Sequence, residues 1–103
     1  MVSTKQLPRE TVRDLLGISR ALYVVRDNQG APPAELDRIR EVSAWLIDAL
    51  ELSRTAPGSL GHRAAWAKAE RATAVLTDLL LTHDESTQRL VGAWAERMRA
   101  NAR

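Results

Sequence analysis

The residues between Ala34 and Arg54 alternate between polar and apolar with the period of an α-helix. Small or apolar side chains recur there at spacings of three and four residues, and two further apolar residues widen the stripe. A helix with so wide an apolar face needs neighbouring helices on more than one side. The stripe consists of Leu36, Ile39, Ser43, Leu46, Leu50 and Ser53, with Val42 and Ala49 beside them.

Two other segments have the same helical period. The first runs to about Arg26 and is predicted to begin at Pro8 or Arg9, because proline suits the first turn of a helix. The other runs over residues 62–81 and is rich in alanine, the best helix former. Residues 27–31 and 55–59 separate the predicted helices, and both combine glycine or proline with polar residues, as loops do.

The C-terminal third has two interpretations. Residues 82–85, Thr-His-Asp-Glu, match a capping box with Thr82 at the cap, which would begin a fourth helix running to about Ala100. The alternative is three helices with a long last one from about Gly61 to Ala100. A heptad-like spacing from Trp66 to Trp94 continues through this point, as it would in one helix.

An internal similarity favours four helices. Residues 20–27 resemble residues 71–78, and residues 40–45 resemble residues 89–94, at offsets of 51 (71 minus 20) and 49 (89 minus 40). Two matches in the same order indicate a duplicated helical hairpin, although short matches also arise by chance in a chain rich in Ala, Arg and Val. We therefore predict an all-α fold, an antiparallel four-helix bundle built from two helical hairpins, as a single domain over residues 1–103.

The composition agrees with one small globular domain. The chain has 103 residues, 45% of them apolar and 27% charged, and only 4% are aromatic. Such a core of aliphatic residues and alanine favours helices over sheets. The chain has no cysteine, which excludes disulfides, thiolate metal sites and a cysteine nucleophile. The net charge of +2 is too small to dictate a class of partner.

The sequence shows neither a signal peptide at its N-terminus nor a membrane-spanning run. The N-terminal residues lack the basic start and apolar run of a signal peptide, and the longest apolar runs, such as residues 44–47, are too short to cross a bilayer. We expect a cytoplasmic protein with no membrane partner.

Candidate catalytic and metal-binding residues are few. Only His62 and His83 are present, and neither has the histidine or glutamate spacing of helical metal sites. His83-Asp84 superficially resembles the metal-binding dipeptide of HD-type phosphohydrolases, but no further histidine supports it. The sequence contains neither a glycine-rich phosphate loop nor a nucleophile elbow. We expect no enzymatic activity, no cofactor and no metal.

The segment Leu15-Leu16-Gly17-Ile18-Ser19-Arg20-Ala21-Leu22-Tyr23 resembles the turn and recognition-helix start of helix-turn-helix DNA-binding proteins. The resemblance covers residues 11–26 and implies a turn at Gly17, with Arg20 and Arg26 on the DNA-facing element. It departs from the family at Arg13, where a small residue is usual, and by one missing residue before Leu22. In the other interpretation a continuous helix runs through Gly17, at a cost of about 1 kcal/mol for the glycine.

The remaining candidate site is a surface for another protein. Trp45, with Ile47 and Leu52, could form an exposed apolar patch, whereas the alternative role of the three tryptophans is core packing. Arg97 and Arg99, with Arg103, could hold an anionic partner, or could simply complement the end of a helix.

The function that these residues favour is a non-enzymatic interaction module, a small adaptor, regulator or inhibitor acting through a helix face. The partner would be another protein or a second copy of the chain. The alternative function is a DNA-binding regulator that uses the helix-turn-helix-like segment.

Overall fold

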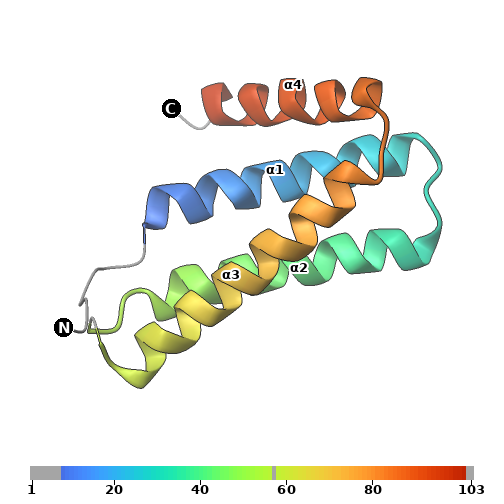
Figure 1. Cartoon of the computed structure of the whole chain (residues 1–103). Helices are drawn as coiled ribbons and strands as arrows, with labels where there is room; N and C mark the ends of the chain where they lie inside the picture. The colour runs from blue at the N-terminus through green and yellow to red at the C-terminus, as the bar shows by residue number, and fades with distance from the viewer. Residues whose placement is uncertain (1–7, 57, 102–103) are drawn as a thin grey trace.

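The computed structural model describes residues 8–56 and 58–101 and contains four helices in this part of the chain. The sequence interpretations that involve Pro57, Arg103 and the first seven residues lie outside the described residues. The helices, shown in Figure 1, are α1 (Arg9–Asn28), α2 (Pro33–Leu52), α3 (Leu60–Leu81) and α4 (Glu85–Asn101). The predicted all-α, four-helix bundle is confirmed.

Local sequence explains the first three helix starts. Pro8 precedes α1, and Pro33 is the first residue of α2, where its missing N–H leaves no hydrogen bond unmade. The Oγ of Ser59 accepts a 3.2 Å hydrogen bond from the backbone N–H of His62 and thereby caps α3. Between α1 and α2, Gly30 has a φ of +79°, which favours glycine.

The capping box predicted at the turn between α3 and α4 is wrong. Asp84 caps α4 in place of Thr82, because its carboxylate accepts a 2.8 Å hydrogen bond from the backbone N–H of Thr87. The hydroxyl of Thr82 instead donates to the carbonyl of Leu79 at the end of α3. The helix therefore ends at Leu81, and the alternative of one long C-terminal helix is wrong.

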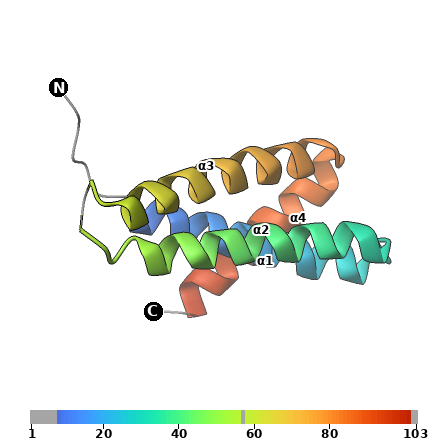
Figure 2. The ribbon, with the colours of Figure 1, turned by 90° about the horizontal axis from the view of Figure 1, so that it is seen from below.

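Helix α1 is the central element of the bundle. It packs along α2, along α4 and, less extensively, on α3, while α3 packs mainly on α2. In Figure 1, α4 and the α2–α3 pair lie on opposite sides of α1, and Figure 2 shows that α4 crosses the other helices obliquely. Helices α3 and α4 do not pack along each other, so both use the α1–α2 hairpin as their platform.

The core lies where α1, α2 and α3 meet. The predicted stripe of α2 faces it, and Ile39, Val42 and Leu46 are fully buried. Helix α4 contributes only Thr87 and Val91 to the buried set, so its attachment is the least extensive. The other buried apolar residues are Val12, Leu16, Ala21, Leu22, Val25, Ala49, Ala65, Ala69, Ala72 and Leu76.

The helix-turn-helix segment is a single helix. Helix α1 continues through Gly17, whose φ is not positive, so the turn that the resemblance implies is absent. The continuous helix keeps Leu16, Ser19 and Leu22 on a buried face, whereas a turn at Gly17 would rotate Leu22 away from it. The buried hydroxyl of Ser19 is satisfied by the Oγ of Ser43 at 2.7 Å. The helix-turn-helix geometry that the resemblance implies is therefore wrong.

Candidate functional site

Within the part of the chain that the structure describes, one side of α1 is not covered by another helix. Helices α2, α3 and α4 pack on α1 in other directions, and a groove bounded by α2 and α4 follows the remaining side. Arg13, Gly17, Arg20 and Val24 recur on this side at spacings of four, three and four, so they form one line along the helix. We call this feature the α1 groove.

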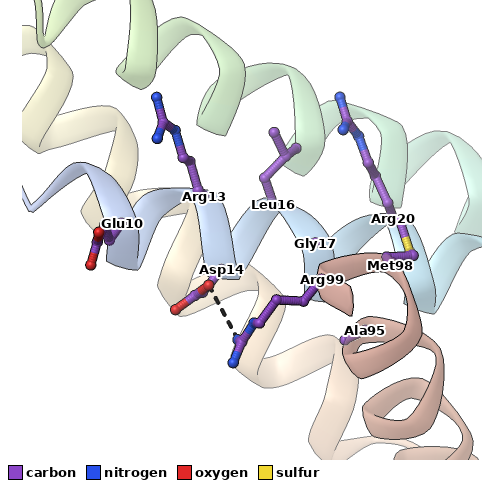
Figure 3. Close-up of a pocket in the computed structure, with 9 residues that line it drawn as sticks. All are labelled: Glu10, Arg13, Asp14, Leu16, Gly17, Arg20, Ala95, Met98 and Arg99. Carbon is purple, nitrogen blue, oxygen red and sulfur yellow. Dashed lines mark ion pairs between the residues drawn. The ribbon is translucent and has the colours of Figure 1, made fainter. Parts of the chain in front are cut away.

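The α1 groove consists of two adjoining recesses of about 710 and 550 Å³. They share Arg20 and Met98, so they form one continuous surface. Figure 3 shows the larger recess. The lining residues are Glu10, Arg13, Asp14, Leu16, Gly17, Arg20, Tyr23 and Val24 of α1, Arg40, Ser43, Ala44 and Ile47 of α2, and Ala95, Met98 and Arg99 of α4.

The floor of the smaller recess is apolar. Val24, Ala44 and Met98 meet there, and the side chain of Ile47 is 41% exposed. An isoleucine that stays so open to water beside other apolar side chains loses the stabilisation that burial would give it. A partner that covered this floor would recover that free energy.

The rim of the α1 groove is basic. Arg13 and Arg20 are exposed, and among the described residues neither has an ion pair or side-chain hydrogen bond. Arg99, by contrast, is 3.2 Å from the carboxylate of Asp14, and Arg40 stacks on the ring of Tyr23 at 5.1 Å. In Figure 3, Arg13 and Arg20 extend from α1 in the same direction, away from the Asp14–Arg99 pair.

Gly17 lies between the two unpaired arginines. A Cβ built at this residue would meet no atom within 4 Å, so the space above its backbone is open. Glycine inside a helix lowers stability by about 1 kcal/mol relative to alanine. Packing within the chain does not explain this glycine, but the open backbone would let a partner approach α1 closely.

The predicted apolar patch is divided between two sides of α2. The ring of Trp45 lies between the guanidinium groups of Arg38 and Arg71, at 5.5 and 4.8 Å, on the side towards α3. Ile47 faces the α1 groove instead. Two residues of separation turn a helix by about 200°, so Trp45 and Ile47 cannot form one surface. Leu52 is half-buried against the core.

The two predicted C-terminal arginines also separate. Arg99 lines the α1 groove, whereas the guanidinium of Arg97 lies over the ring of Trp94, 5.6 Å from its centroid. Two of the five predicted binding residues, Ile47 and Arg99, are therefore brought together in the groove.

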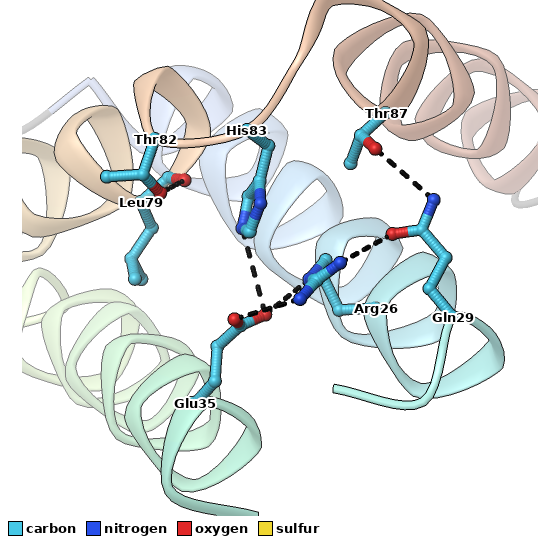
Figure 4. Close-up of polar contacts among 7 residues, drawn as sticks. All are labelled: Arg26, Gln29, Glu35, Leu79, Thr82, His83 and Thr87. Carbon is cyan, nitrogen blue, oxygen red and sulfur yellow. Dashed lines mark hydrogen bonds and ion pairs between the residues drawn. The ribbon is translucent and has the colours of Figure 1, made fainter. Parts of the chain in front are cut away.

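A separate polar cluster lies at the C-terminal end of α1 and is shown in Figure 4. The guanidinium of Arg26 binds both carboxylate oxygens of Glu35, with Nη2 3.1 Å from Oε1. This contact holds the pKa of Glu35 below its ordinary value. The Nε2 of His83 lies 3.7 Å from the same carboxylate. Gln29 connects this cluster to α4 by donating to the hydroxyl of Thr87.

This cluster has a structural explanation. Its members connect the α1–α2 loop with the α3–α4 turn, and Arg26 is committed to Glu35 instead of being available for DNA. The depressed pKa of Asp84 likewise arises from the backbone N–H of Thr87, which Asp84 caps.

The described residues contain no group of three or more His, Cys, Asp or Glu side chains that could hold a metal ion. Across the same residues, no helix has the length and hydrophobicity required to cross a membrane. Comparisons with models of known protein families, with curated proteins and with solved structures give no match.

Sequence reasoning missed most of the α1 groove. The line from Arg13 to Val24 could have been recognised from its helical spacing once α1 was treated as continuous. The contributions of Ala44 and Met98 carry no sequence signal, because they depend on how α2 and α4 pack on α1.

Proposed function

We propose that this protein is a non-enzymatic interaction module that binds a protein partner in the α1 groove. The observation that carries the proposal is the uncovered side of the central helix, where a solvent-open apolar floor adjoins Arg13 and Arg20, which have no partner among the described residues. Interfaces commonly combine an apolar centre with a charged rim and are enriched in arginine, methionine and tyrosine. The groove contains all three residue types.

The length and openness of the groove support a segment of a protein over a small metabolite. Its lining runs from Glu10 to Val24, a separation of fourteen residues and about 21 Å along the axis of α1. Both recesses are broad and open to solvent, whereas small-molecule sites enclose most of their ligand. An extended partner would contact both recesses at once.

A photo-crosslinking experiment tests the proposal. A photoreactive amino acid replaces Ala44, in the groove, or as a control Ala74, which is exposed on α3. In the native source we expect one protein to be crosslinked from the first site and not from the second. Equal labelling from the two sites, or none from Ala44, contradicts the proposal.

A pair of substitutions tests the apolar floor. Ile47→Glu should weaken binding of the crosslinked partner by about 30-fold, the effect of losing a contact worth about 2 kcal/mol. Leu81→Glu is the matched control, because Leu81 is 70% exposed and lies outside the groove. If both variants bind as the unmodified protein does, the floor takes no part in binding.

A further inference from the structure

We infer that the α1 groove takes an acidic amphipathic helix, whose apolar stripe covers Ile47 and Met98 and whose carboxylates face Arg13 and Arg20. This inference rests on the proposed function and adds the chemistry of the partner. Three observations carry it: the charge of the rim, the spacing of its arginines and the open backbone at Gly17.

The charge of the groove favours a negative partner. Its lining contains four arginines against the two carboxylates of Glu10 and Asp14, and Asp14 is already paired with Arg99. Arg13 and Arg20 have no partner of their own among the described residues. A carboxylate can accept two parallel hydrogen bonds from a guanidinium, the geometry in which arginine binds most specifically.

The spacing of the arginines favours a helix. Arg13 and Arg20 are seven residues apart, two turns and about 10.5 Å along α1. A partner helix lying along α1 presents two carboxylates at the same separation if they too are seven residues apart. Leucine-type side chains three and four residues beyond the carboxylate that faces Arg20 then face the apolar floor.

The geometry around Gly17 also favours a helix. Helix α1 already packs on three other helices, and a partner helix would add a fourth neighbour along its uncovered side. Because nothing lies within 4 Å of a Cβ position at Gly17, the axes of two helices can approach closely there, as small residues allow.

The apolar floor favours protein over nucleic acid. Phosphate-binding surfaces are strongly basic and polar, whereas Val24, Ala44, Ile47 and Met98 form one continuous apolar area here. Glu10 would also repel a phosphate backbone.

The test uses a display library of helical peptides of about 18 residues, about 27 Å long. Each peptide carries a fixed leucine stripe, and its flanking positions are drawn from glutamate, lysine and glutamine. The full chain selects binders from this library. We expect enrichment of glutamate at flanking positions seven residues apart, and depletion of lysine.

The charge-reversed variant Arg13→Glu/Arg20→Glu provides the critical comparison. Both side chains are exposed, and circular dichroism should show an unchanged helical content. Selection by this variant should favour lysine, and it should bind the original acidic peptides at least about 10-fold more weakly. Arg54→Glu/Arg63→Glu is the matched control, since both residues are exposed and lie outside the groove.

The possible failures are distinguishable. If enrichment ignores charge while Ile47→Glu abolishes peptide binding, the groove is a binding site but the acidic partner is wrong. If no selected peptide depends on Ile47 or on the two arginines, the proposed function fails as well. If duplex DNA displaces the peptides and does not bind the charge-reversed variant, the inferred acidic partner is wrong and the groove binds nucleic acid.

Discussion

Replacing Gly17 with alanine should stabilise the isolated protein. Gly17 lies inside α1, has no positive φ and leaves open space where a Cβ would be, so alanine adds no clash. The gain comes from the lower helix propensity of glycine and from the greater conformational freedom of the unfolded glycine chain. Together these effects are worth about 0.5 to 1 kcal/mol.

Thermal and urea unfolding followed by circular dichroism measure this gain. For a domain of this size, 1 kcal/mol raises Tm by about 4 to 8 °C, so Gly17→Ala should raise it by a few degrees. Gly92→Ala is a matched control, because Gly92 also lies in a helix with no atom near its Cβ position, and it should be stabilising too. Gly30→Ala should be destabilising, because φ is +79° there.

The sign of the effect decides between two structures. A glycine that forms a helix-turn-helix turn would lose stability on substitution, because alanine disfavours positive φ. If Gly17→Ala lowers Tm while Gly92→Ala raises it, α1 is not a continuous helix, and the groove built on it is wrong.

Three further predictions concern the core, the loop cluster and α4. Leu22→Ala should lower the free energy of unfolding by about 2 to 5 kcal/mol in urea titrations, because Leu22 is fully buried and truncation leaves a cavity; a loss below about 1 kcal/mol would contradict its place in the core. The pKa of Glu35 is depressed by Arg26, so the stabilisation from this pair is complete above the ordinary value of 4.5 and is lost as pH falls through the depressed pKa. Urea titrations at decreasing pH should show this loss of stability. The variant Glu35→Gln should be less stable at neutral pH, and its free energy of unfolding should fall less steeply in acid. If the free energy of unfolding of the variant falls as steeply as that of the unmodified protein, other carboxylates cause the acid decline. Amide hydrogen exchange should be fastest in α4, which buries only Thr87 and Val91 among its described residues, and slower exchange in α4 than in α2 would contradict this ranking.

The sequence predicts the helices well because their signals are local. The stripe of α2 appears in the structure as a row of buried or half-buried residues, and the cap at Ser59 forms as its sequence indicates. Local signals mislead where two residues compete for one role. Thr82 and Asp84 both suit an N-cap, and the one chosen depends on where α3 ends.

The candidate site was less accessible to sequence reasoning because it depends on which helices pack together. Trp45 and Ile47 are close in sequence but face different neighbours, α3 and the groove. In the sequence Arg13 stands out only as a departure from the helix-turn-helix motif, whereas in the structure it lines the groove with Gly17 and Arg20. The oblique crossing of α4, which places Met98 over α1 and α2, has no signature in the sequence.

Amide chemical shifts show directly whether the open side of α1 binds an acidic helix. The labelled protein is titrated with an acidic amphipathic peptide of about 18 residues that carries the leucine stripe. We expect shift changes along α1 between Arg13 and Val24 and around Ala44 and Ile47, with little change around Trp45. Changes centred on Trp45, or no changes at all, would contradict it.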